Sequence, residues 1–152
     1  MLRALVAAIA VGLAVVGLAT AATGKSETYK FKAGLTAGAE VPKPKGVPAN
    51  ATGTFTATTV EPKSGPIRLT WKLTFADLSG KAVQAHIHLG KPGKAGNVLV
   101  ALCAPCGTGQ TGKATITHDV EDALERGKTY VNVHTPKNLA GEIRGQVKET
   151  EG

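Results

Sequence analysis

Two histidines, His86 and His88, lie two residues apart in a segment where apolar and polar residues alternate. Such alternation is typical of a β-strand with one buried face, so both imidazoles are expected to point away from the apolar face. His134 stands in a second alternating segment, Tyr130–Thr135, with the same phase relative to its valines. Neutral imidazole binds both Cu(II) and Zn(II), and a sheet holds its ligands at fixed distances. If the two strands are neighbours, His86, His88 and His134 form a metal site.

The same three histidines also have a purely structural interpretation. They could hydrogen-bond to the backbone and to the side chains of Asn132 or Glu142, and so shape adjacent strands without any metal. In a metal site, Asn132 and Glu142 would instead orient the imidazoles from outside the coordination sphere. An organic ligand is a third alternative. The residue types and spacing leave all three open.

Cys103 and Cys106 are the only cysteines of the chain, in the segment Leu-Cys-Ala-Pro-Cys-Gly. A zinc site would need a second pair of ligands at suitable spacing, and a thioredoxin-like motif would need to begin a helix. The residues that follow, Gly107 to Gly112, are typical of a loop. In an oxidising compartment we therefore expect a local Cys103–Cys106 disulfide that shapes this loop, with free thiols as the alternative.

Other kinds of chemistry have little support. No serine lies in the Gly-x-Ser-x-Gly context of a hydrolase nucleophile. The Gly-rich stretch 90–96 precedes a strand rather than a helix, so it lacks the helix N-terminus that favours phosphate. The charge of +7 comes from lysines scattered singly through turns, without the aromatic residues that nucleic-acid binding needs. The sequence thus favours a non-catalytic role and no nucleic-acid partner.

The first 21 residues have the composition of a secretory signal peptide. Arg3 is followed by an apolar, Ala-rich run, and Ala19-Thr20-Ala21 has the small-x-small pattern of a cleavage site. The run is shorter than the ~20 residues of a membrane-spanning helix, although an uncleaved anchor is the alternative. We expect cleavage after Ala21, no membrane span in the mature chain, and a periplasmic or secreted location.

Composition and periodicity predict an all-β fold. The chain has 152 residues, 19 of them Gly, and 42% of its residues are hydrophobic, which suits one small domain and disfavours helical bundles and disorder. The clearest period-2 pattern runs from Ile67 to Phe75, with Trp71 at its centre on the apolar face, and Tyr29–Thr36 alternates similarly. The other strand-like segments are Thr52–Val60, Ala82–Leu89, Asn97–Cys103, Thr111–Thr117, Lys128–Thr135 and Glu142–Lys148. Seven or eight short strands at this spacing predict an antiparallel β-sandwich or Greek-key-like barrel.

One short helix is predicted between the last strands. Asp119 is a candidate N-cap for a helix over Val120–Arg126, and Gly127 would end it. On this prediction His118 is a loop residue. The neighbouring pair Glu121 and Asp122 is expected to be solvated, as charged residues on short surface helices usually are. Glu142 and Arg144 alternate with Ile143 and Val147, so they are expected on the outer face of the last strand rather than as an acid–base pair.

Several segments together resemble the CHRD domain family, which is named from chordin and is widespread in secreted bacterial proteins. The strongest are Ala85-His86-Ile87-His88-x-Gly90, Tyr130-Val131-Asn132-Val133-His134-Thr135 and Gly141-Glu142-Ile143-Arg144-Gly145-Gln146. Weaker ones are Glu40-Val41-Pro42, Ala51-Thr52-Gly53 and Leu78-Ser79-Gly80. The resemblance covers residues 29–148, leaving 22–28 as a lead-in and 149–152 as a tail.

The resemblance implies a secreted β-rich binding or interaction module whose ligand the sequence does not identify. It also implies that the two histidine segments lie together, because both recur in the family. The first functional hypothesis is a non-catalytic binding module with an extracytoplasmic partner. The second is a protein that binds copper or zinc, or a copper-dependent redox protein, through His86, His88 and His134.

Overall fold

The computed structural model of the chain describes residues 26–151, so the predicted signal peptide lies outside the described residues. The elements in chain order are β1 (Glu27–Thr36), the 3-10 helix η1 (Ala37–Ala39), β2 (Thr52–Glu61), β3 (Ile67–Ala76), β4 (Gln84–Leu89), β5 (Val98–Cys103), β6 (Gln110–Ile116), α1 (His118–Glu125), β7 (Thr129–Thr135), β8 (Asn138–Gln146) and β9 (Lys148–Thr150). All predicted strands are present, although β8 begins four residues before Glu142.

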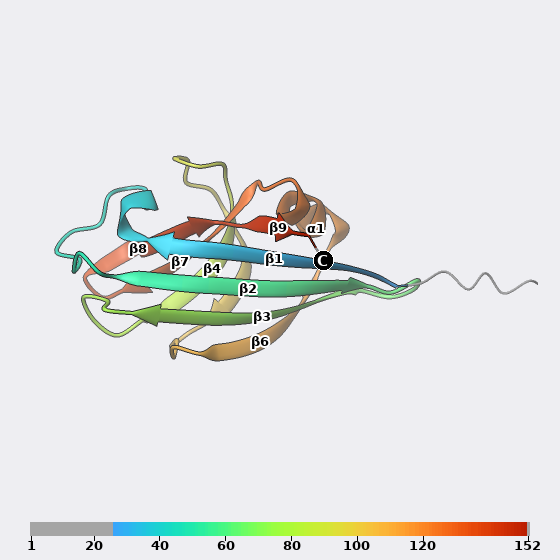
Figure 1. Cartoon of the computed structure of the whole chain (residues 1–152), viewed down its shortest axis with the longest axis horizontal. Helices are drawn as coiled ribbons and strands as arrows, with labels where there is room; N and C mark the ends of the chain where they lie inside the picture. Colours follow the sequence, from blue (N-terminus) through green and yellow to red (C-terminus); the bar gives the residue numbers. More distant parts are fainter. Residues whose placement is uncertain (1–25, 152) are drawn as a thin grey trace, which may run out of the picture.

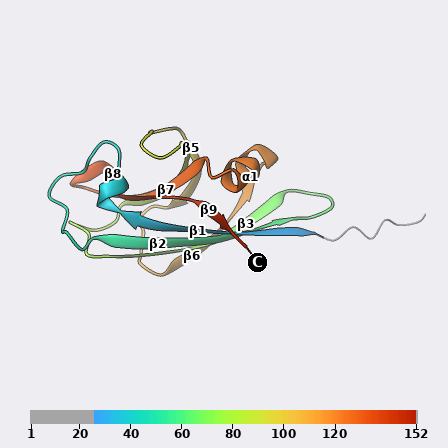
Figure 2. The same cartoon turned by 45° about the horizontal axis from the view of Figure 1, so that its top comes forward.

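The strands form one antiparallel sheet in the order β5-β4-β7-β8-β1-β2-β3-β6, and β9 pairs with β1. Strands β1, β2 and β3 are ten residues each and pair along almost their full length. Strands β5 and β6, at the two ends of the order, approach each other, so the sheet is a nearly closed barrel. Figures 1 and 2 show β2, β3 and β6 on one side and β7 and β8 on the other. The predicted all-β class is confirmed.

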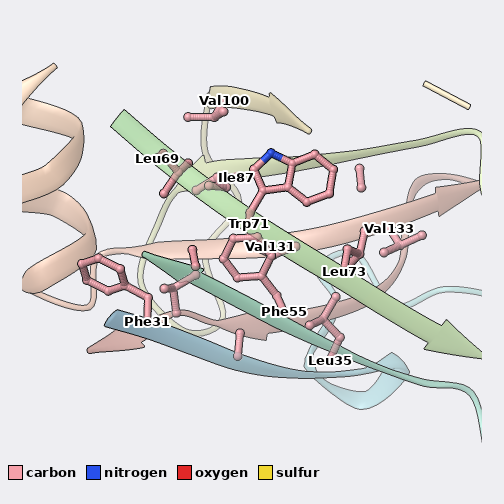
Figure 3. Packing of buried hydrophobic residues seen from close by; sticks show 14 of the residues in the cluster. Phe31, Leu35, Phe55, Leu69, Trp71, Leu73, Ile87, Val100, Val131 and Val133 are labelled. Carbon is pink, nitrogen blue, oxygen red and sulfur yellow. The ribbon is translucent and has the colours of Figure 1, made fainter. Parts of the chain in front are cut away.

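The core occupies the inside of this barrel. Alternate residues of each strand point inward, as the period-2 patterns predict. Figure 3 shows side chains from both sides of the barrel packed together, among them Phe31, Leu35, Phe55, Leu69, Trp71, Leu73, Ile87, Val100, Val131 and Val133. Trp71 is buried, as predicted, and its indole lies directly over the backbone of Gly112 in β6. Any side chain at Gly112 would overlap this ring.

The helix differs from its prediction in two respects. It begins at His118, and its N-cap is Thr117, whose Oγ1 accepts a hydrogen bond from the Val120 amide. Asp119 is therefore not the cap, because the preceding threonine can already satisfy a first-turn amide. His118 is the first helical residue rather than part of a loop. Glu121 is buried, contrary to prediction, because it lies on the face of α1 that packs against the barrel.

The ends of the domain are part of the sheet. Strand β1 begins at Glu27, inside the predicted lead-in, and β9 pairs with β1 from within the predicted tail. Figure 1 shows α1 and β9 close together at the end of the barrel where β1 begins. Among residues 26–151, no helix has the length and apolarity required to cross a membrane.

Candidate metal centre

Strand pairing brings the two histidine segments together. Strands β4 and β7 are antiparallel neighbours, with His86 opposite Asn132 and His88 opposite Tyr130. His134 is two residues beyond Asn132, so it is a diagonal neighbour of His86 on the same face, within reach of an imidazole. The inward-facing residues between them, Ile87 and Val133, are fully buried in the core. Core packing therefore fixes which face carries the histidines.

The three imidazoles form one compact cluster. One ring nitrogen from each of His86, His88 and His134 lies within 4.8 Å of the others. His86 Nδ1 and His134 Nε2 are 3.2 Å apart. The centroid of the His86 ring lies 5.0 Å from that of His134 and 5.5 Å from that of His88. Of the three, His86 is half-buried, while His88 and His134 are buried.

Backbone carbonyls orient two of the rings. The Nδ1 atom of His88 lies 2.9 Å from the Gly96 carbonyl oxygen, and Nδ1 of His134 lies 2.9 Å from that of Leu139. Because a carbonyl oxygen can only accept, each Nδ1 must carry the proton in the neutral ring. The Nε2 atom of each ring is then an unprotonated electron-pair donor. This is the tautomer of a metal ligand whose other nitrogen is held by a second-sphere acceptor.

His88 Nε2 is the atom of the cluster that stands without a partner. It is buried and makes no hydrogen bond within residues 26–151. His134 Nε2 differs, because the Nδ1–H of His86 can donate to it. His88 Nε2 is thus the buried ring nitrogen of the cluster that has no hydrogen-bond partner among the described residues.

The environment favours the neutral form of His86 and His134. Burial, and then the charges of His134 and His88, lower the pKa of His86 to about 4. Burial also lowers the pKa of His134, and this effect exceeds the opposite one of its hydrogen bond to Leu139. Neutral imidazole is the form that coordinates a metal. These two rings are therefore ready to act as ligands at neutral pH.

The loop between β4 and β5, residues 90–97, is fixed over this face of the sheet. Arg144 Nη2 in β8 donates to the carbonyls of Lys91 and Lys94, at 3.1 and 2.8 Å. The Gly96 amide donates to Tyr130 Oη at 3.2 Å, and Gly96 is the residue whose carbonyl holds His88. Arg144 lies 3.3 Å from the centre of the Tyr130 ring. These contacts position the Gly96 carbonyl before any ligand binds.

Asn132 and Glu142 are near the cluster but have other partners among the described residues. Asn132 Nδ2 lies 3.4 Å from the Ala140 carbonyl oxygen. The Glu142 carboxylate accepts hydrogen bonds from Ser79, Thr135 and Asn138. His88 and His134 donate instead to the backbone carbonyls of Gly96 and Leu139, and the side-chain pattern could not indicate which carbonyls these would be.

The outer face at Glu142 and Arg144 is covered rather than solvated, since the two residues are 0% and 1% exposed. The cover includes the segment between β1 and β2, where Asn138 hydrogen-bonds the backbone of Lys45 in both directions. Glu40, in the same segment, is also buried, and burial raises its pKa despite the hydrogen bond from Val41 and the charge of Arg144. Sequence reasoning missed Glu40, whose only signal was its place in a segment of the family resemblance.

Cys103 and Cys106 lie at the end of β5 and just beyond it. Their sulfur atoms are 2.05 Å apart, which is disulfide-bonding distance. Both pack against the core. Neither belongs to a group of potential metal ligands among the described residues. They take no part in the histidine cluster.

Comparison with known families decides the classification. A sequence model of the CHRD domain family matches residues 31–147. The chain belongs to the CHRD domain family. The match includes both histidine segments, both cysteines and the whole loop over the cluster, so the candidate centre is built within the CHRD domain itself. No curated protein and no solved structure matches the chain at a significant level.

Proposed function

We propose that this CHRD domain is an extracytoplasmic binding module that holds Cu(II) or Zn(II) through His86, His88 and His134. The observation that carries the proposal is the buried, unpartnered Nε2 of His88, whose Nδ1 is fixed by the Gly96 carbonyl. An unpaired buried polar atom costs free energy. A metal ion bound to that electron pair would remove the cost.

The spacing of the donor atoms suits such an ion. Bonds of about 2.0–2.1 Å in a tetrahedral arrangement place two nitrogen ligands about 3.3 Å apart. His86 Nδ1 and His134 Nε2 are already 3.2 Å apart. The ligand atoms would be these two and His88 Nε2. When the metal binds through His86 Nδ1, the proton of that nitrogen would be exchanged through solvent for one on Nε2 of the same ring, which stays neutral.

Three imidazoles suit both proposed metals and leave a coordination position open. Cu(II) binds nitrogen ligands more tightly than Zn(II) in the general affinity order of divalent ions. Because the three ligands are neutral, the bound ion would keep its full positive charge and attract water or an anionic group to the fourth position. His86 is half-buried, so solvent can reach the cluster on its side.

An extracytoplasmic location is supported by one feature of the sequence and one of the structure. The first 21 residues have the charge and composition of a cleaved signal peptide, and Cys103 and Cys106 lie at disulfide-bonding distance. Disulfides persist mainly in oxidising compartments. The proposal therefore includes export followed by cleavage after Ala21, which sequencing of the N-terminus of the natively expressed protein would test.

Titration of the purified mature protein with Cu(II) and with Zn(II) tests the metal site. Calorimetry measures the binding of both ions, and electron paramagnetic resonance measures the coordination of Cu(II). We expect a stoichiometric Cu(II) site with nitrogen hyperfine structure. Replacement of His86, His88 or His134 by Ala should each weaken it by at least about tenfold, since even second-sphere losses cost about 10–100-fold. Thr56→Ala is the control, because it changes an exposed side chain of β2 outside the cluster.

The alternative hypotheses give different results. If the histidines are only structural, the three variants lose thermal stability equally with and without metal, and copper binds weakly without nitrogen hyperfine structure. If the module binds an organic ligand there, metal binding is likewise absent. Either result would remove the metal proposal and leave a CHRD module with another ligand.

A further inference from the structure

A second group of metal-ligating side chains lies where α1 meets the end of β2. It consists of Glu61, the last residue of β2, with His118 and Glu121 of α1, and one ligand atom from each lies within 4.8 Å of the others. His118 Nδ1 and Glu61 Oε1 are 3.2 Å apart. His118 and Glu121 are three residues apart on the helix and therefore share one face.

Glu121 is the unusual member of this group. It is only 3% exposed, and its Oε1 atom has no hydrogen-bond partner among residues 26–151. Glutamate is almost never this buried unless it is paired or coordinates a metal, since an unsatisfied carboxylate oxygen is costly. The burial thus indicates a missing cationic partner.

Negative charge accumulates around the group although the chain as a whole is strongly basic. Glu27 of β1 lies directly opposite Glu61 of β2 in the strand register. Burial, and then the charges of Glu121, Asp122, Glu149 and Glu61, raise the pKa of Glu125. Lys63 lines the same surface depression as Glu27 and Glu61. A divalent cation here would relieve this repulsion.

We propose that Glu61, His118 and Glu121 form a second metal site, selective for a borderline divalent cation such as Zn(II). One imidazole with two carboxylates is a donor set that Zn(II) accepts, whereas Ca(II) and Mg(II) prefer oxygen ligands only. The His118 side chain is 76% exposed and that of Glu61 is 31% exposed, so the ion would enter from solvent. The buried Glu121 carboxylate would form the floor of the site.

Calorimetric titration of the full mature protein with Zn(II) tests this site independently of the three-histidine site. We expect wild type to bind two equivalents. His118→Ala and Glu121→Gln should each weaken one of them by at least about tenfold. His134→Ala should weaken only the other. If the three-histidine proposal fails and this one holds, wild type binds a single equivalent that depends on His118 and not on His134.

Glu125→Gln is the matched control, because it removes a neighbouring negative charge without removing a ligand. Zinc binding that falls as much in Glu125→Gln as in Glu121→Gln would overturn the proposal in favour of diffuse charge attraction. Binding unchanged in both His118→Ala and Glu121→Gln would overturn it outright.

Thermal unfolding provides a second readout that also controls for folding. Metal-free Glu121→Gln should be at least as stable as wild type, because it replaces a buried unpaired carboxylate with a neutral group. The effect of zinc is measured in a His134→Ala background, where only this site remains. Zinc should raise the Tm of the His134→Ala protein but not that of the double variant that also carries Glu121→Gln. An equal zinc-dependent rise in the two would contradict the assignment.

Discussion

The ring of Tyr130 stacks on the imidazole of His88, with ring centroids 4.8 Å apart and ring planes 6° from parallel. The two residues face each other across β4 and β7. Tyr130 also accepts a hydrogen bond from the Gly96 amide, while Gly96 accepts one from His88. One tyrosine therefore fixes both the plane of the His88 ring and the backbone group that sets its tautomer.

Two substitutions separate these contributions of Tyr130. Tyr130→Phe keeps the stack but loses the hydroxyl, and should cost about 1 kcal/mol of unfolding free energy. Tyr130→Leu also removes the stacked ring and should cost about 3 kcal/mol or more. Copper affinity should fall more in Tyr130→Leu than in Tyr130→Phe. Denaturant unfolding and copper titration measure the two effects, and equal copper affinities would show that the stack does not orient His88.

Gly96→Ala should disrupt the loop over the cluster. A Cβ at Gly96 would overlap the Leu89 carbonyl oxygen, so the backbone must move. We expect a loss of at least about 2 kcal/mol in stability and a weaker metal site, because the carbonyl that holds His88 shifts. Gly34→Ala is the control, since a Cβ there meets nothing within 4 Å. Similar losses in both variants would argue against a special role for this loop.

The metal-free protein should lose stability as the pH falls from about 6.5 to about 4. The pKa of His86 is lowered from 6.5 to about 4 by burial and by its histidine neighbours. Between these values the unfolded chain binds a proton at His86 that the folded chain does not, so acid favours unfolding. His86→Gln should reduce this dependence when stability is measured by denaturant unfolding across the range. An unchanged pH profile in the variant would show that His86 titrates normally in the folded protein.

Glu142→Gln should destabilise the fold, because the Glu142 carboxylate is buried and depends on its hydrogen bonds. The carboxylate accepts hydrogen bonds from Ser79, Thr135 and Asn138, and these outweigh burial and lower its pKa. The amide nitrogen of Gln would face donors where an acceptor is needed, so we expect a loss of about 3 kcal/mol. The exposed Glu149→Gln should change stability by less than about 0.5 kcal/mol. Because a lowered pKa stabilises above the unfolded value, the difference between wild type and Glu142→Gln should shrink as the pH falls below about 4.3.

The side-chain period of the strands predicts the core but not what covers the opposite face. Phase alone places Ile87 and Val133 inside and His86 and His134 on the other side, and the structure agrees. Phase cannot say that β4 and β7 are neighbours, since pairing is a long-range choice. That expectation came from the family resemblance.

Burial of Glu40, Glu121 and Arg144 could not be predicted from local sequence. Each is buried in the folded domain, whereas single charged residues in turns, helices and outer strand faces are usually solvated. The partners of the imidazoles are carbonyls of Gly96 and Leu139, and every residue type carries a carbonyl. The sequence therefore predicts the candidate ligands better than it predicts what orients them.

The candidate centre has its ligands on two strands that meet only through long-range pairing, and the groups that orient them come from further away still. His86 and His134 are 48 residues apart, and Arg144, which holds the loop above His88, lies beyond both. The unfolded chain has no such arrangement of donors, so tight coordination would be a property of the folded domain alone. Under the proposed export, the ion would be taken up from the compartment in which the protein works, after its last long strand has joined the sheet.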